Sequence, residues 1–232
     1  MTKPESTSPS HQPPRLRLAT IVSAPFGENT YIAHFDGRED CLVFDPGLEP
    51  GAIVKHLERQ GLRPAAFMIT HGHSDHIGGN TAMKRRWPDV PLVIGRGDAP
   101  KLTDAELNLS ATYGISLLSP PADVLLDEGD TYRAAGFELE VFEIPGHSSG
   151  HVVYLWRGGR PNVVFGGDVL FRGSIGRTDF PDGSFEALAS GIHRKLFTLA
   201  DDTLVLPGHG DPTTVGEEKR HNPFVGLDAM GE

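Results

Sequence analysis

The sequence predicts an α/β protein built as a four-layer αββα sandwich, with two sheets inside and helices on both outer faces. Two observations lead to this fold class. Short apolar runs bounded by turn residues are followed by segments with helical spacing, and this succession occurs in both halves of the chain. The 232 residues are also enough for one sizeable core, whereas two full domains would be small.

The elements of the first half follow from its apolar runs and from the residues that interrupt them. Alternating or short apolar runs predict strands at Leu16–Val22, Thr30–Phe35, Cys41–Phe44, Ala65–Ile69 and Leu92–Ile94. Helical spacing predicts helices at Ile53–Arg59 and Gly78–Trp87, and Pro88 stops the second of them. Residues 100–119 are expected to form short helices over a cleft.

The second half repeats the pattern of the first. Apolar runs predict strands at Val124–Leu126, Phe137–Ile144, Val152–Trp156, Val163–Phe165 and Thr203–Leu206. A helix is expected at Ser184–Leu196, before the last strand. Two such halves bury their apolar faces best when the two sheets pack against each other.

Composition sets limits on the class of protein. The first fourteen residues are rich in Ser, Pro and Thr and lack the apolar centre of a secretion signal, so residues 1–14 are expected to be a disordered leader before a single domain over residues 15–232. No stretch approaches the ~20 apolar residues of a membrane span. The net charge of −10, without clustered Lys and Arg, argues against a nucleic-acid surface.

The number of cysteines excludes two further kinds of site. Cys41 is the only cysteine, which excludes an intramolecular disulfide and a Cys-rich zinc site. A reducing, cytoplasmic location fits this composition best. The expected partner is a small molecule, and the sequence leaves the oligomeric state open.

The chemistry is concentrated where one strand ends. Thr70-His71-Gly72-His73-Ser74-Asp75-His76 directly follows the apolar run Ala65–Ile69. Three imidazoles and a carboxylate within six residues suit zinc, iron or manganese. The small Gly72 and Ser74 allow the loop to fold tightly, so that several side chains converge.

Three more candidate ligands stand in the same local context. His147 follows the strand ending at Ile144, Asp168 follows the strand ending at Phe165, and His209 follows the strand ending at Leu206. Ligands at the ends of successive strands fall along one edge of a sheet, where α/β proteins place their sites. The pattern therefore predicts one metal centre rather than four separate polar loops.

These residues resemble a known family. Asp45 in Phe44-Asp45-Pro46-Gly47, the His71–His76 cluster, His147, Asp168 and His209 match, in order, the five motifs of the metallo-β-lactamase-fold superfamily. The resemblance covers the chain from about residue 16. The segments 145–151 and 167–171 look most like hydroxyacylglutathione hydrolases (glyoxalase II) and their short bacterial relatives.

The resemblance implies two divalent metal ions, with zinc expected and iron or manganese as alternatives. One ion would be bound by His71, His73 and His147, and the other by Asp75, His76 and His209, with Asp168 bridging them. Asp45 would lie behind the ligands and orient one imidazole. His151 would brace the loop and not bind metal.

Two bridged cations lower the pKa of a shared water, so that the resulting bridging hydroxide can attack an acyl carbonyl near neutral pH. A thiolate leaves without a strong general acid, because the pKa of a thiol is about 8.5. Thioesters are therefore suitable substrates, and the expected enzyme is a metal-dependent thioester hydrolase. Asp75 could also steer the proton of the water, which makes it the predicted catalytic residue.

The thiol that such an enzyme would accept is less well defined. Asn222-Pro223-Phe224 comes only thirteen residues after His209, so the C-terminal helical segment that helps hold glutathione in the long family members is missing. Arg177 falls where that family has a basic residue near the glutathione carboxylate and is the predicted substrate contact. Asp179 lies close to the position where the family has an aromatic residue.

Other activities share this scaffold. Gly176–Phe180 also resembles persulfide dioxygenases, which would use a single iron at His71, His147 and Asp168, although Ile175 replaces their cysteine. Lactone or ester hydrolysis could use the same dinuclear site. His76 and the missing cysteine ligand argue against a class B β-lactamase, and a metal-stabilised scaffold without activity is the non-enzymatic alternative.

Overall fold

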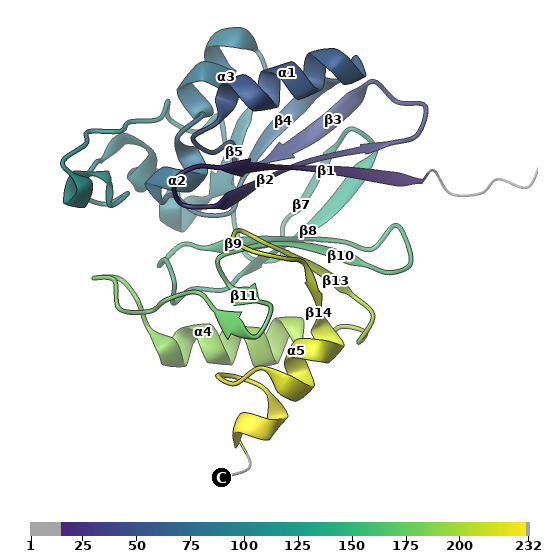
Figure 1. The fold of residues 1–232 in the computed structure, drawn as a ribbon, viewed down its shortest axis with the longest axis vertical. Coiled ribbons are helices and arrows are strands. Elements are labelled where there is room, and N and C mark those ends of the chain that lie inside the picture. Colours follow the sequence, from purple (N-terminus) through teal and green to yellow (C-terminus); the bar gives the residue numbers. More distant parts are fainter. Residues whose placement is uncertain (1–14, 231–232) are drawn as a thin grey trace, which may run out of the picture.

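Two six-stranded sheets face each other in the middle of the molecule, and helices cover their outer faces (Figure 1). The strand order is β1-β2-β3-β4-β5-β6 in the first sheet and β14-β13-β10-β9-β8-β7 in the second. The computed structural model describes residues 15–230, so the leader predicted over residues 1–14 lies outside the described residues. The predicted αββα sandwich is confirmed.

The first sheet takes its strands from the N-terminal half of the chain. They are β1 Leu16–Ser23, β2 Glu28–Phe35, β3 Asp40–Phe44, β4 Arg63–Ile69, β5 Leu92–Gly95 and β6 Val124–Leu126. The strands β1 to β3 are antiparallel, and β3 to β6 are parallel. The helices here are α1 Pro50–Gln60, α2 Ser74–Ile77 and α3 Asn80–Arg86, with 3-10 turns at Arg96–Thr103 and Ser110–Tyr113.

The second sheet comes from the C-terminal half. Its strands are β7 Thr131–Ala134, β8 Phe137–Glu143, β9 Val152–Trp156, β10 Val163–Gly167, β13 Leu204–Pro207 and β14 Thr213–Thr214. A small hairpin pairs β11 Leu170–Phe171 with β12 Ser174–Ile175. The helices are α4 Phe185–Gly191, continued by a π-helical turn at Ile192–Leu196, α5 Val215–His221 and a 3-10 turn at Leu227–Met230.

Two details differ from the sequence prediction. The strand at Val124–Leu126 was expected with the second half, but it pairs with β5 in the first sheet. The helix expected at Gly78–Trp87 begins at Asn80, because the Gly79 N–H is bonded to the Pro46 carbonyl at 2.7 Å. The predicted start of α4 is confirmed by Ser184, whose hydroxyl accepts a hydrogen bond from Ala187 N.

The packed sheets bring the ends of the important strands to one edge. Phe44 of β3 and Phe165 of β10 stack with ring centroids 3.6 Å apart, which fixes the two sheets against each other. Within the second sheet, β10 and β13 are parallel, and Gly167 is paired with Pro207. The segments that follow β4, β10 and β13 therefore meet where the two sheets converge.

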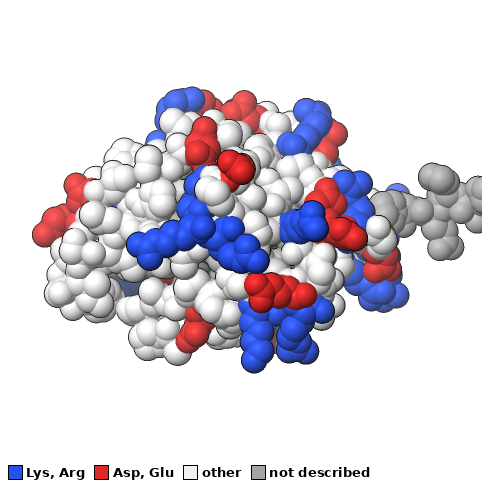
Figure 2. Space-filling model, turned by 90° about the horizontal axis from the view of Figure 1, so that it is seen from above, with Lys and Arg blue, Asp and Glu red and all other residues white. Residues whose placement is uncertain are grey.

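The outer face over α1 and α3 carries charges of both signs (Figure 2). An ion pair of 3.5 Å between Arg86 and Glu58 links the two helices there. Within residues 15–230, none of the helices combines the length and the apolar character that crossing a membrane requires.

Candidate metal centre

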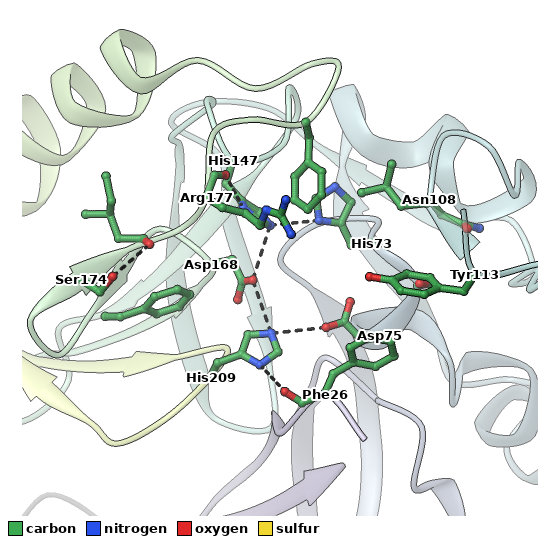
Figure 3. Close-up of a pocket in the computed structure, with 15 residues that line it drawn as sticks. Phe26, His73, Asp75, Asn108, Tyr113, His147, Asp168, Ser174, Arg177 and His209 are labelled. Atoms are coloured by element: carbon green, nitrogen blue, oxygen red, sulfur yellow. Dashed lines mark hydrogen bonds and ion pairs between the residues drawn. The ribbon is translucent and has the colours of Figure 1, made fainter. Parts of the chain in front are cut away.

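The seven predicted ligand side chains converge on one site between the two sheets. Figure 3 labels His73, Asp75, His147, Asp168 and His209 among them. They come from four segments, which follow β4, β8, β10 and β13 in the chain. Their potential ligand atoms fall into three overlapping groups, each with all atoms within 4.8 Å of one another: His71, His73 and His147; His71, His76 and Asp168; Asp75, His76 and His209.

The first half of the site consists of histidines alone. Nδ1 of His73 lies 3.1 Å from Nε2 of His71 and 2.9 Å from Nε2 of His147. Nitrogen atoms that share a tetrahedral cation at the usual bond length are about 3.3 Å apart. The three rings therefore already have the spacing of a tetrahedral ligand set.

The second half combines carboxylates with histidines. Nε2 of His209 lies 3.3 Å from Asp75 and 3.4 Å from Asp168, and Nε2 of His76 lies 3.4 Å from Asp168. Asp168 is also 3.4 Å from Nε2 of His147, which belongs to the first half. Its two oxygens thus lie between the halves, where a bridging carboxylate would be.

Unsatisfied polar atoms show that the donor set suits cations. Nε2 of His76 and Oδ1 of Asp168 are buried and lie 3.4 Å apart, and neither forms a hydrogen bond of normal geometry. An unpaired buried polar group costs about 1–3 kcal/mol, and more when it is charged. A divalent cation that accepts both lone pairs would remove this cost.

The protonation of the two halves differs. Burial lowers the pKa of His71 and takes that of His73 to about 3, so these rings are neutral. Burial also lowers the pKa of His209, but hydrogen bonds to Asp168 and Asp75 outweigh it and raise the pKa to about 10. The carboxylates of the second half therefore favour positive charge beside them, as a bound cation would supply.

Three of the ligand rings are hydrogen-bonded through the nitrogen that points away from the site, so that the other nitrogen stays free. His76 Nδ1 donates to Asp45 at 3.1 Å, and His147 Nδ1 donates to the Arg177 carbonyl at 2.9 Å. His209 Nδ1 donates to the Phe26 carbonyl at 3.2 Å. A proton fixed on Nδ1 leaves the Nε2 lone pair for a metal.

Thr70 completes this arrangement, although it was not among the predicted site residues. Its backbone N–H and its hydroxyl both donate to the Asp45 carboxylate at 2.7 Å. Since that hydroxyl proton is used, Oγ1 accepts from His71 Nδ1 at 3.1 Å. Asp45 is thus placed to orient His76 directly, as expected, and His71 through Thr70.

Two further residues surround the ligands. Nε2 of His151 accepts a hydrogen bond from Asp168 N at 3.0 Å, so this histidine lies in the bracing position expected for it. Position 208 requires glycine for a steric reason, because a Cβ there would clash with Asp168 Oδ1 and His76.

A cavity of about 320 Å³ opens above the ligands and is lined by side chains from both halves of the chain. Arg177 lies on its wall (Figure 3). Its guanidinium is paired with Asp179, and its role as a substrate contact stays a prediction.

A largely buried cluster of Asp98, Lys101, Ser148 and the half-buried Asp182 braces the ligand loops, and no sequence pattern indicated it. The Asp98 carboxylate accepts hydrogen bonds from Gly72 N at 2.8 Å and Gly150 N at 2.7 Å. Ser148 Oγ contacts both Asp98 and Lys101 Nζ. Lys101 Nζ also lies 2.6 Å from Asp182.

Comparison with known proteins agrees with this geometry. Residues 24–209 match the family model of the metallo-beta-lactamase superfamily. The chain belongs to this superfamily. Among curated relatives, it is 41% identical over 202 residues to the probable metallo-hydrolase YqgX of Bacillus subtilis, covering 87% of this chain and 93% of that protein. It is 35% identical over 217 residues to the hydroxyacylglutathione hydrolase GloC of Haemophilus influenzae, covering 90% and 98%.

Solved structures of the superfamily give the same result. The BLEG-1 B3 metallo-beta-lactamase superimposes with a TM-score of 0.85 at 36% identity, covering 90% of this chain and 99% of that one. TTHA1623, solved in a di-iron-bound form, gives 0.78 at 36% identity, with coverages of 89% and 99%. These relatives and the His-rich site support a metal-dependent hydrolase.

Proposed function

We propose that this metallo-beta-lactamase superfamily member hydrolyses thioesters with two divalent cations. His71, His73 and His147 would hold one cation, and Asp75, His76 and His209 the other, with Asp168 between them. The observation that carries the proposal is the meeting of both ligand sets at the floor of one cavity, with Asp168 within 3.4 Å of histidines from each. The relative GloC, named a hydroxyacylglutathione hydrolase, supports the choice of thioesters.

The bound cations would supply an activated water and polarise the acyl oxygen of the substrate. The chain itself contributes orientation. Asp75 lies beside His209 at the cavity wall, where its carboxylate can accept the proton of the attacking water. Asp45 and Thr70 fix the rings of His76 and His71, so that little reorganisation is needed during the reaction.

Thioesters fit this site for a chemical reason. A thiolate leaves without being protonated first, since its conjugate acid has a pKa of about 8.5. An amine leaving from an amide must receive a proton as it leaves. Most side chains of this site would hold cations and could not donate a proton to a leaving group. The site is therefore better suited to thioesters than to amides.

One observation bears on the persulfide dioxygenase alternative. A single iron at His71, His147 and Asp168 would leave Asp75, His76 and His209 as a second complete group of ligands without a cation. The dinuclear hydrolase uses every member of the set. Because BLEG-1 is described as a B3 metallo-beta-lactamase, β-lactams belong in the test together with esters and lactones.

The proposal is tested by measuring metal content and activity on one preparation. We expect two metal ions per chain, cleavage of thioesters such as S-D-lactoylglutathione or a simpler analogue, loss of activity with a chelator, and recovery with zinc, iron or manganese. A fully loaded protein that cleaves no thioester contradicts the proposal. Oxygen consumption with glutathione persulfide by a one-iron form would favour the dioxygenase instead.

A further inference from the structure

We propose that the thiol arm of the substrate is uncharged and apolar. Asp179 sets this preference by forming an ion pair with Arg177, which keeps the guanidinium from binding a substrate carboxylate. The inference rests on the proposed thioester hydrolysis and adds to it the class of thiol. Its evidence is the chemistry of the cavity wall above the metal ligands, where a substrate would extend away from the reacting carbonyl.

The wall is predominantly apolar. Six of the lining side chains above the ligands are apolar or aromatic: Phe26, Leu109, Tyr113, Phe171, Ile175 and Phe180. Phe26 and Tyr113 meet edge to face with ring centroids 5.4 Å apart, although they come from distant parts of the chain. Both rings are solvent-exposed, at 40% and 58%, so a substrate covering them would bury apolar surface that water now contacts.

The polar groups of the wall are mostly bonded within the protein. The side-chain amide of Asn108 donates to the carbonyls of Lys101 and Leu117, and its oxygen accepts from Ser110 N. The hydroxyl of Ser174 is bonded to the Ile175 carbonyl at 3.5 Å. Asn108 therefore has little hydrogen-bonding capacity left for the amides of a peptide-like thiol, and the proton of Ser174 is directed at the chain itself.

Arg177 is the one Lys or Arg among the side chains that line the cavity, and it already has an anionic partner. Its Nε and Nη2 each lie 2.7 Å from an oxygen of Asp179, which is a bidentate pair. Its guanidinium also lies 4.4 Å from the ring centroid of Phe180. A substrate carboxylate would have to displace Asp179 and would then remain close to its negative charge.

The cavity size agrees with a short, compact substrate. Its volume of about 320 Å³ is near the lower end of the range for small-molecule sites. A thiol with an aromatic or aliphatic group next to sulfur could cover the Phe26–Tyr113 surface. A tripeptide thiol would extend into solvent and bring two carboxylates toward Asp179.

The first test compares three thioesters of one acyl group, made with benzyl mercaptan, N-acetylcysteamine and glutathione. Each kcat/KM is divided by the hydroxide-catalysed rate of the same compound, which removes differences in intrinsic reactivity. We expect the benzyl thioester to exceed the glutathione thioester at least tenfold, with the neutral polar thiol between them. A preference for glutathione overturns this inference but leaves thioester hydrolysis intact, whereas cleavage of none of the three contradicts the proposed function itself.

The second test is Asp179→Asn, which removes the charge at an exposed position where folding is not at risk. The ratio of kcat/KM for the glutathione thioester to that for the benzyl thioester should rise about three- to tenfold, as expected for releasing one exposed ion pair. Arg177→Ala together with Asp179→Asn should abolish the rise, because the released cation is then missing.

The matched control is Glu138→Gln, which breaks the exposed Arg133–Glu138 pair of β7 and β8, outside the cavity lining. This variant should keep the wild-type ratio. An unchanged ratio in Asp179→Asn, or an equal change in the control, would show that Asp179 does not determine the preference.

Discussion

Two ion pairs hold the loop of residues 177–183, and they differ in their exposure to solvent. At its far end, Asp182, with its side chain 31% exposed, pairs with Lys101 of the largely buried cluster, where the Lys101 side chain is 6% exposed and that of Asp98 is fully buried. At its near end, Arg177 and Asp179 form a pair with side chains 60% and 68% exposed. The difference in solvent access predicts different roles, because water screens the exposed pair more strongly than the largely buried one.

The buried cluster holds metal ligands, and the exposed pair faces the substrate. Asp98 binds the N–H of Gly72, which lies between His71 and His73, and Ser148 is adjacent to His147. Displacing this cluster would move the all-histidine half of the site. Changes at the exposed pair should alter which substrates bind and leave the cation positions as they are.

The largest effect is expected for Asp98→Asn. The amide would direct its NH₂ at a backbone N–H, and Lys101 would lose its buried counter-charge. Breaking a buried pair in this way costs about 3 kcal/mol or more. Urea unfolding should show this loss, and metal analysis should show a lower occupancy than in the wild type.

A control for Asp98→Asn is Asp127→Asn, which breaks the exposed Arg96–Asp127 pair at 2.8 Å. This change should cost no more than about 1 kcal/mol and leave metal content unchanged. Equal losses in the two variants would contradict the distinction between the buried and exposed pairings.

A smaller effect is expected for Lys101→Met, which keeps the aliphatic stem beside Gly72. Asp98 would still accept two backbone hydrogen bonds, while Asp182 would keep only its bond from Ser149 N at 2.9 Å. We expect a cost of about 2 kcal/mol, less than for Asp98→Asn, because fewer buried groups lose partners. The double variant should cost less than the sum of the two single ones, since both act on one cluster. Strict additivity in urea unfolding would show that Asp98 and Lys101 act independently.

The stability of the protein at low pH should also depend on this cluster. Burial raises the pKa of Asp182, but Lys101 and the Ser149 N–H outweigh burial and lower the pKa to about 2, from 3.8. A lowered pKa in the folded state means that Asp182 stabilises the protein above pH 3.8 and that this contribution is lost as the pH falls toward 2. The thermal unfolding midpoint of the wild type should therefore fall more between pH 4 and pH 2 than that of Asp182→Asn. Parallel curves would exclude Asp182 as a contributor.

The two regions also differ in how far the sequence could predict them. The His71–His76 cluster is local in the chain, and each remaining ligand follows an apolar strand, so both signals can be recognised without coordinates. Asp98 and Ser148 are separated by 50 positions, and nothing near either one predicts that they meet. Long-range polar contacts of this kind depend on how the sheets pack.

The elements that the sequence analysis missed have a related cause. β7 alternates only over four residues, and α5 contains a single large apolar residue, Val215, so neither has a periodic pattern to detect. The strand Val124–Leu126 was recognised, but its sheet was not, because three residues of one strand carry no information about their neighbour. Pairing with β5 is decided by the fold as a whole.

The smallest effect on stability is expected for Arg177→Ala. The variant loses an exposed ion pair and the contact of its guanidinium with Phe180, each worth about 0.5–1 kcal/mol in such positions. Urea unfolding should therefore change by about 1 kcal/mol, well below the change for Asp98→Asn. A loss as large as that of Asp98→Asn would mean that Arg177 supports the fold and that the exposed pair is not confined to the substrate side. A small loss accompanied by an altered preference among thiol arms would separate the two roles, since stability depends on buried partners and selectivity on the charge presented to the cavity.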